Sequence, residues 1–307
     1  MRNVLKILAS VILIAVVIVS SIAAVFSYYI RCDLLSSEFY LGIAADSFYM
    51  EMVKHSIHLE FESQSSYVGI PVEVFDAALD DSQLHLMLRE HIESAVNYLN
   101  GLAPYTEPEY PVELIRDPLY AYLEQTAKEQ GTVPAKEQYA QIDLVALDSA
   151  ALIQKYICVI DLNLVKDRTA FQSVFHYLPN SKDVYIPAIL VTLGAIALLA
   201  LLNGKDWRSG LNRIMTAFWL SGSILLVPML ALQITGLTGR LSIETGYFKF
   251  FVDSVLKDMN RYFLLWGALL FLVGSVALLL LKTVGRPAAK DSGFRPGEYS
   301  VNNLSDK

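Results

Sequence analysis

The chain of 307 residues has little charge and almost no cysteine. Charged side chains make up 18% and hydrophobic ones 54%, whereas an average soluble domain has about 25% and about 45–50%. Two cysteines are too few to hold the fold together, which excludes a disulfide-rich secreted scaffold. The net charge of −7 argues against a nucleic-acid partner, because such proteins present a basic face. This composition is typical of a membrane protein.

Four long apolar stretches lack Asp, Glu, Lys, Arg and His altogether. Each can cross a hydrocarbon core of roughly 30 Å as a helix that rises about 1.5 Å per residue. The predicted spans are Ile7–Ile30, Val184–Leu202, Ile214–Ile234 and Tyr262–Leu281. We interpret residues 1–30 as an uncleaved signal anchor, because the apolar run exceeds the roughly 7–15 residues of a signal-peptide core.

The distribution of charge predicts the orientation of these spans. Lys and Arg flank the spans at the N-terminus, in the loop 203–213 and in the tail 282–307, so those segments are expected in the cytoplasm. Residues 31–183 hold 24 acidic and 10 basic side chains, a net charge of −14, and are expected outside. The sequence thus predicts a multi-pass plasma-membrane protein in contact with the lipid bilayer, with both termini cytoplasmic.

The expected fold is all-α, with four transmembrane helices and a large helical extracytoplasmic domain, residues 31–183, between the first two. Asp80-Asp81-Ser82 predicts the start of a helix that Asn100-Gly101 ends. The window 46–62 predicts another helix, and the stretch from about Asp148 to Tyr177 a third. The proline-containing segment from Gly101 to Pro118 predicts an extended crossing.

Two further extramembrane segments complete the expected organisation. The outer loop 235–261 carries an amphipathic stretch from Tyr247 to Arg261, which is expected to extend the fourth span outward as a helix. The cytoplasmic tail 282–307 is polar and contains Gly and Pro, so it is expected to be disordered.

No catalytic signature accompanies these segments. The sequence has no Gly-x-Ser-x-Gly, Walker A, Gly-x-Gly-x-x-Gly or Cys-x-x-Cys pattern, and no cofactor is expected. If their segment is helical, Glu51, His55, His58 and Glu62 share one stripe, which is a donor set for a divalent transition metal. The alternative is that these residues form the solvated face of an amphipathic helix.

Two weaker signals lie in the same acidic region. His85, Arg89 and Glu93 repeat at a spacing of four, so this row either binds an anion or consists of ordinary surface pairs. Cys32 and Cys158 both fall in the segment expected outside, where a disulfide is permitted, although the apolar surroundings of Cys158 equally suit a buried thiol.

The topology allows three functional hypotheses. The first is a non-enzymatic envelope protein whose acidic domain binds a partner protein or ligand in a scaffold, assembly or sensing role. The layout of one span, a large outer domain and three further spans also resembles that of the FtsX/MacB class of ABC-system membrane subunits, which implies an accessory subunit of an ABC-type transport complex. In this chain only residues 1–6 precede the first span and the inner loop 203–213 is short. The third hypothesis is that the chain is a metal-dependent enzyme at the outer membrane face.

Overall fold

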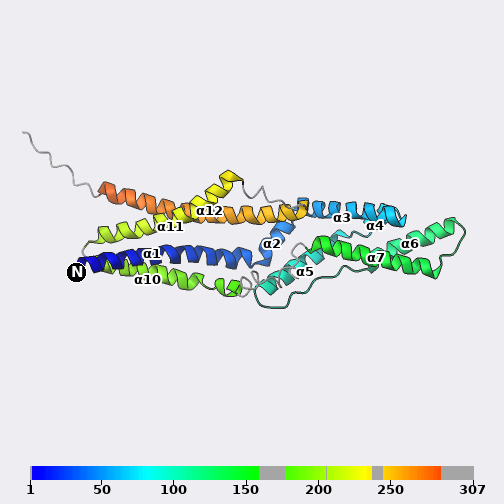
Figure 1. Cartoon of the computed structure of the whole chain (residues 1–307), viewed down its shortest axis with the longest axis horizontal. Coiled ribbons are helices and arrows are strands. Elements are labelled where there is room, and N and C mark those ends of the chain that lie inside the picture. Colours follow the sequence, from blue (N-terminus) through cyan, green and yellow to red (C-terminus); the bar gives the residue numbers. More distant parts are fainter. Residues whose placement is uncertain (1, 159–176, 205, 237–244, 285–307) are drawn as a thin grey trace, which may run out of the picture.

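The computed structural model describes residues 2–158, 177–204, 206–236 and 245–284, and its regular structure in these ranges is entirely helical. Figure 1 shows an elongated molecule with four long helices at one end and a group of shorter helices at the other. The shorter helices, which we call the α2–α7 unit, are α2 (Ser37–Ala44), α3 (Ser47–Val68), α4 (Val72–Asp76), α5 (Asp81–Leu99), α6 (Glu113–Glu129) and α7 (Lys136–Ile157).

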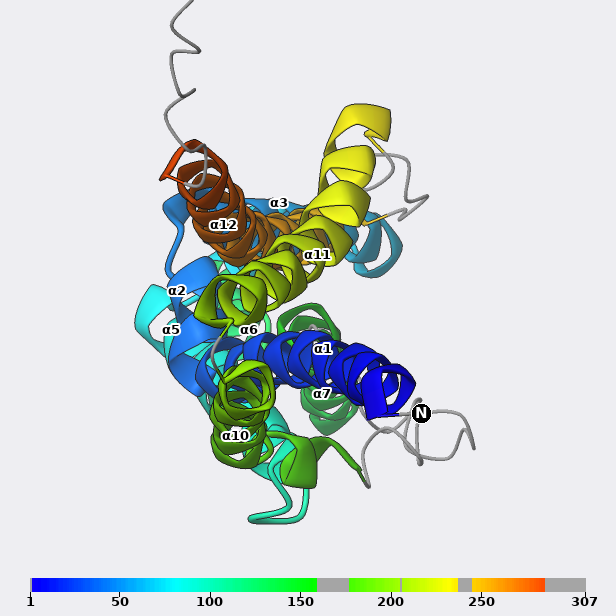
Figure 2. The same ribbon diagram turned by 90° about the vertical axis from the view of Figure 1, so that its left-hand side faces the viewer.

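Four helices are long and apolar enough to cross a membrane, as the sequence predicts. They are α1 (Arg2–Tyr29), which continues into the π-helical turn η1 (Ile30–Leu34), α10 (Tyr185–Asn203), α11 (Trp207–Thr235) and α12 (Gly246–Val284). Figure 2 shows them as two pairs, α1 with α10 and α11 with α12. Both α11 and α12 begin well before the predicted apolar runs, because amphipathic turns continue each helix beyond its membrane segment.

Glycines bring α11 and α12 into close contact. A Cβ atom on Gly274 would stand 2.6 Å from the backbone nitrogen of Trp219 and 2.8 Å from the backbone oxygen of Met215. A Cβ atom on Gly222 would likewise meet the backbone of Phe271. Such close approach of two backbones is how helices gain contact in lipid, where the hydrophobic effect does not drive helices together. Helix α11 contains Pro228, and the C-terminal end of this helix diverges from α12 (Figure 1).

Polar side chains connect α1 to its neighbours, one pair within the apolar bundle and one beside the start of the third apolar run. The hydroxyls of Ser20 and Thr192 lie 2.7 Å apart and join α1 to α10. The guanidinium of Arg213 on α11 donates a hydrogen bond to Ser10 on α1. These contacts satisfy polar groups that lipid could not.

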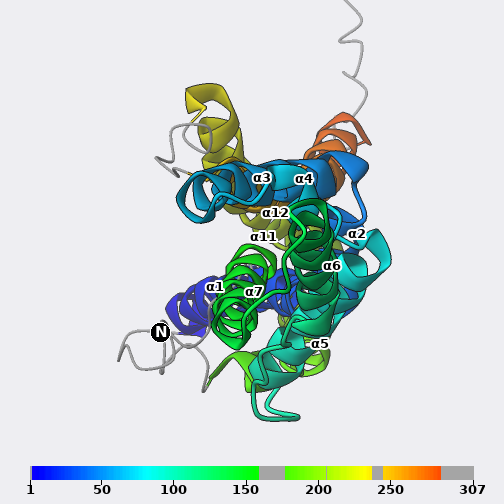
Figure 3. The same ribbon diagram turned by 90° about the vertical axis from the view of Figure 1, so that its right-hand side faces the viewer.

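The α2–α7 unit has one continuous core, and α12 takes part in it. The buried face of α3 supplies Tyr49, Met50, Val53, Ile57 and Phe61. Tyr247 and Phe251, from the first turns of α12, are buried in the same cluster. Figure 3 shows α3 lying across the end of α12. A single helix therefore runs from the membrane bundle into the core of the α2–α7 unit.

Local signals in the sequence account for the start of several helices. The side chain of Asp80 accepts a hydrogen bond from the backbone N–H of Gln83 at 2.8 Å, so the predicted capping residue begins α5. Asp46 caps α3 in the same way through Phe48, and α3 covers the predicted window 46–62. At the other end of α5, Asn100 donates a hydrogen bond to the carbonyl of Leu35 at 3.0 Å, which ties α5 to η1.

Two predictions about the α2–α7 unit are confirmed only in part. The segment from Gly101 to Pro118 is free of helix only as far as Val112, because α6 begins at Glu113 and accommodates Pro118 within its second turn. At this position the proline removes a donor to the carbonyl of Leu114, and the complete burial of Ile115 and Leu119 in the core offsets that loss.

The predicted helix from Asp148 to Tyr177 is confirmed from Asp148 to Ile157. It begins earlier, as α7 at Lys136, because the side chain of Gln138 accepts a hydrogen bond from the N–H of Ala135 at 2.8 Å. It ends at Ile157, since Cys158 leaves the helical region with a ψ of 73°. The rest of that prediction lies in 159–176, outside the described residues, as does the predicted disordered tail beyond Val284.

Candidate functional site: a pocket between α2 and α5

The periodicity of α5 determines which side chains face α2. Leu84 and Leu88 are buried at a spacing of four and anchor α5 in the core. His85 and Arg89, each one residue further along, are exposed on an adjacent stripe of the helix. The structure thus places the predicted His–Arg pair at the edge where α5 meets α2.

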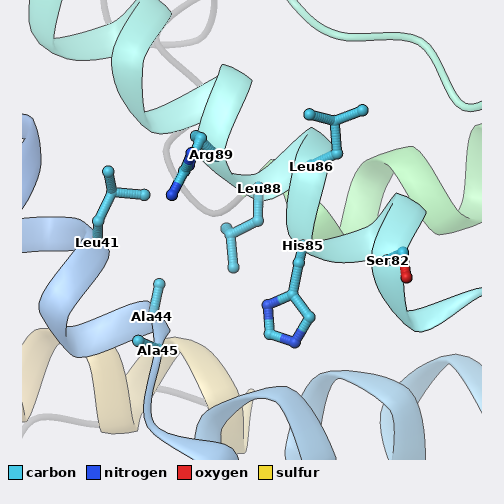
Figure 4. A pocket seen from close by; sticks show the side chains of 8 residues that line it. All are labelled: Leu41, Ala44, Ala45, Ser82, His85, Leu86, Leu88 and Arg89. Atoms are coloured by element: carbon cyan, nitrogen blue, oxygen red, sulfur yellow. The ribbon is translucent and has the colours of Figure 1, made fainter.

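A cavity of about 300 Å³ lies at this edge. Its lining combines small and apolar residues of α2 and its C-cap with one face of α5, namely Leu41, Ala44, Ala45, Ser82, His85, Leu86, Leu88 and Arg89. Figure 4 shows His85 and Leu88 extending from α5 into the space between the helices, with Ala44 and Ala45 across from them. The guanidinium of Arg89 is directed toward Leu41. The pocket therefore has an apolar wall and a basic rim.

The two basic side chains of the rim are unpaired in the part of the chain that the structure describes. Within the described residues, neither His85 nor Arg89 makes a hydrogen bond or an ion pair. Glu93, the third member of the predicted row, does not line the cavity. An unpaired guanidinium beside an imidazole and a hydroxyl is suited to bind a carboxylate or another anionic group, because charge-assisted hydrogen bonds are among the stronger polar contacts.

The opposite side of α2 contacts the membrane helices. The ring of Tyr40 stacks on that of Phe251 of α12, with centroids 6.0 Å apart and an interplanar angle of 17°. The Tyr40 hydroxyl donates a hydrogen bond to the carbonyl of Leu34, in η1, at 2.8 Å. Burial raises the pKa of Tyr40 to about 12. Thus α2, a helix of 8 residues, has the pocket on one side and both α12 and η1 on the other.

The predicted metal stripe does not assemble into a metal site within the described residues. Glu51, His55 and Glu62 are exposed on α3. His58 Nδ1 lies 2.8 Å from a carboxylate oxygen of Asp76, at the end of α4, and His58 Nε2 lies 3.4 Å from Glu62. The hydrogen bond to Asp76, with a smaller contribution from Glu62, raises the pKa of His58 above its ordinary value of 6.5. His58 therefore links α3 to α4.

The remaining candidate residues have separate positions. His91 is fully buried in α5, with Nδ1 3.1 Å from the hydroxyl of Tyr105, whereas His176 lies outside the described residues. Cys32 is exposed in η1 and Cys158 is buried at the end of α7, and the structure forms no disulfide between these two described residues.

Sequence reasoning missed the α2 wall of the pocket. Leu41, Ala44 and Ala45 belong to a helix too short to give a recognisable period, and only Ser36 before it is a typical capping residue type. The His85–Arg89 spacing was the one signal for this site.

Comparison with protein-family models, with curated proteins and with solved structures finds no match for this chain. Function is therefore inferred from the geometry of the site and from charge.

Proposed function

We propose that this chain is a non-enzymatic integral membrane protein whose α2–α7 unit binds an anionic ligand. Ligand binding changes the position of α2, and α2 transmits that change to the membrane helices. The observation that carries this proposal is the position of α2 between the pocket and α12. Leu41, in the pocket wall, directly follows Tyr40, which stacks on Phe251. A ligand that displaces α2 changes this contact and so biases the arrangement of α12.

The ligand class follows from the lining. Arg89 and His85 favour a carboxylate or similar anion, and the side chains of Leu41, Leu86 and Leu88 favour a short apolar group attached to it. A small organic acid or an acidic terminus of a peptide from an envelope partner meets both requirements.

The orientation we propose is extracytoplasmic for residues 31–183 and cytoplasmic for both termini, in a plasma membrane. Its support is the net charge of −14 on residues 31–183 together with the basic residues flanking the opposite ends of the spans. The gathering of the α2–α7 unit beyond one end of the four long helices agrees with this orientation (Figure 1).

The alternatives have less support. An ABC-type subunit needs a segment that contacts an ATPase, yet only residues 204–206 separate α10 from α11. A metal-dependent enzyme needs a ligand cluster, and Glu51 and His55 do not join the contacts of His58. Turnover of a lipid or envelope substrate by the purified protein would overturn the non-enzymatic proposal.

Ligand binding is tested with hexanoate as the probe and hexanol as its neutral analogue. We expect the full chain in detergent to bind hexanoate more tightly than hexanol in a calorimetric titration. Arg89→Gln should weaken hexanoate binding about tenfold, since a hydrogen bond to a charged group contributes about 1.5–3 kcal/mol. The matched control is Lys128→Gln, which removes an exposed cation of α6 that lies outside the pocket. Equal loss in both variants would contradict a specific site.

The relay is tested by a distance measurement. Spin labels at Gly42→Cys, in α2, and Lys257→Cys, in α12, report the separation of the two helices after Cys32 and Cys158 are replaced. Both positions are exposed, and a Cβ at position 42 meets no atom within 4 Å. Saturating hexanoate should shift the distance distribution, and Tyr40→Ala should abolish the shift while hexanoate still binds. An unchanged distribution in the parent protein would refute the relay.

The partner is sought by mild crosslinking in native membranes, followed by co-purification and mass spectrometry. If a specific envelope protein is recovered with the parent chain and lost with Arg89→Gln, the ligand is an acidic peptide terminus of that partner. A stoichiometric cytoplasmic ATPase would instead favour the transport-subunit alternative.

A further inference from the structure

A second site lies where α1 and α12 leave the bundle, next to the α2–α7 unit. A cavity of about 260 Å³ is lined here by Tyr29, Asp33, Phe39, Asp258, Arg261, Tyr262 and Leu265. Two carboxylates, one guanidinium and three aromatic rings therefore surround one space. None of these residues lines the pocket between α2 and α5.

Apart from the Tyr262 hydroxyl, which donates a hydrogen bond to the carbonyl of Val25 at 3.3 Å, the polar side chains of this cavity have no partners in the part of the chain that the structure describes. Asp33, Asp258 and Arg261 make no side-chain hydrogen bond or ion pair there. Tyr29 is only 4% exposed, and its hydroxyl is buried without a hydrogen-bond partner. A buried hydroxyl without a partner costs free energy, so an occupant that bonds to it is favoured.

The backbone of η1 contributes to this arrangement. The N–H of Leu35 donates to the carbonyl of Ile30 at 2.9 Å, one residue further back than in an α-helix. This π turn changes the register of Asp33 relative to Tyr29 at the end of α1. Single π turns inside helices occur frequently at functional sites.

A second, apolar groove borders this cavity on the side of the bundle. It has a volume of about 370 Å³ and is lined by Ala24, Val25, Tyr28, Tyr185, Ile189, Tyr262 and Trp266. Tyr262 lines both spaces. Because α1 and α12 run antiparallel, residues 24–28 of α1 and Trp266 of α12 lie at the deeper level, whereas Asp33 and Asp258 lie together at the outer level. The combined space is polar at one end and apolar at the other.

The aromatic side chains place this change of polarity at a membrane surface. Tyr28, Tyr185, Tyr262 and Trp266 gather at one end of the spans, and such aromatic belts mark the level of the lipid headgroups. A molecule that fills both spaces has its polar part at that level and its apolar part among the spans, as a phospholipid does.

We infer that this junction binds one zwitterionic phospholipid whose headgroup carries a primary ammonium. Asp33 and Asp258 accept hydrogen bonds from the ammonium, Arg261 pairs with the phosphate, and an acyl chain occupies the groove beside Trp266. A phospholipid with a glycerol headgroup carries the same phosphate but no ammonium, so it offers the two carboxylates no cation and keeps a net negative charge beside them, which is unfavourable. The rings of Tyr29 and Tyr262 add cation–π attraction for the ammonium.

The test is a lipid titration of the full chain followed by native mass spectrometry. The probes are dioleoyl lipids with ethanolamine, glycerol or choline headgroups, so that only the headgroup varies. We expect the ethanolamine lipid to bind about fivefold more tightly than the glycerol lipid. One or two partly exposed ion pairs with the ammonium account for a preference of this size. Equal affinity for the ethanolamine and glycerol lipids would overturn the proposal. If the choline lipid bound as tightly as the ethanolamine lipid, the requirement for a primary ammonium would be wrong.

Variants identify the side chains involved. In the double variant Asp33→Asn with Asp258→Asn, the preference for ethanolamine over glycerol should disappear, and because it is a ratio it is insensitive to partial unfolding. Ala24→Trp, which fills the apolar groove, should weaken the binding of all three lipids to the same extent. Glu38→Gln is the matched control, since this exposed carboxylate adjoins Phe39 but does not line the cavity. A preference that survives in the double variant, or one that Glu38→Gln removes, would refute the assignment.

Discussion

Tyr40 and Phe251 stack across the boundary between the α2–α7 unit and the membrane helix α12, with ring centroids 6.0 Å apart. Phe251 is 4% exposed and Tyr40 is 7% exposed, so the contact is part of a packed core. Aromatic pairs of this kind contribute about 0.5–1.5 kcal/mol beyond the burial of their area. This contact makes the two halves of the molecule interdependent in stability.

Removing one ring should destabilise the whole chain. We expect Phe251→Ala to lower the free energy of unfolding by about 3–5 kcal/mol, as for other large core side chains. The measurement is denaturant unfolding in detergent micelles, with Leu269→Ala as the control because Leu269 is 47% exposed on the same helix. A double-mutant cycle with Tyr40→Ala should give a coupling of about 0.5–1.5 kcal/mol, and additive effects would show that the rings do not interact.

Because α11 and α12 approach each other closely at their glycines, we expect that replacing such a glycine even by alanine destabilises the protein. Gly274→Ala places a methyl group 2.6 Å from the backbone nitrogen of Trp219, which cannot move independently of its helix. We expect a loss of about 1–3 kcal/mol, as in other overpacked sites. Gly194→Ala in α10 is the matched control, since nothing lies within 4 Å of the new methyl group. That variant should be neutral or stabilising, and a similar loss in both would contradict close packing.

His58 should make stability depend on pH. Because the hydrogen bond to Asp76 raises the pKa of His58 in the folded state above 6.5, its stabilising contribution is complete below that value. The contribution is then lost as pH rises through the raised pKa. This pair should make the free energy of unfolding at pH 6 higher than that at pH 8.5 by less than about 1 kcal/mol, because the imidazole is partly exposed.

The variants separate this pair from other titrating groups. His58→Gln and Asp76→Asn should each remove the same part of the pH dependence. His55→Gln, on the exposed face of α3, should leave the dependence as it is. A dependence that is unchanged in His58→Gln would contradict the assignment.

The proposed orientation predicts the reactivity of the cysteines. Cys32 is exposed in η1, whereas Cys158 is 8% exposed. A membrane-impermeant maleimide added to intact cells should therefore label the protein, and Cys32→Ser should eliminate the label. Labelling that appears only after the membrane is permeabilised would place the α2–α7 unit in the cytoplasm. Cys158→Ser serves as the control that should still be labelled.

Local signals in the sequence account for a large part of the fold. The four spans follow from uninterrupted apolar runs, and Asp80 marks the start of α5 through a hydrogen bond within its own helix. These features need only neighbouring residues. The sequence could not show that Pro118 lies inside a helix, because packing of Ile115 and Leu119 into the core overrides the local preference.

The candidate site was harder to predict because it belongs to two helices. The spacing of His85 and Arg89 indicated a shared face, but the wall formed by Ala44 and Ala45 depends on how α2 packs against α5. The same limit applies to Asp33 and Asp258, which are far apart in the chain and line one cavity only because η1 and the outer part of α12 lie close together in the fold. Pairwise contacts of this kind leave no periodic pattern in a single sequence.

The burial of Tyr247 and Phe251 among the residues of the α2–α7 unit has a consequence for biosynthesis. A ribosome completes α2 to α7 long before it makes α12, so during translation the unit lacks two of its core side chains. Its exposed apolar surface stays open until the last span inserts. Expression of residues 31–183 alone should therefore give an aggregation-prone fragment, and premature termination before α12 should lead to degradation of the whole nascent protein.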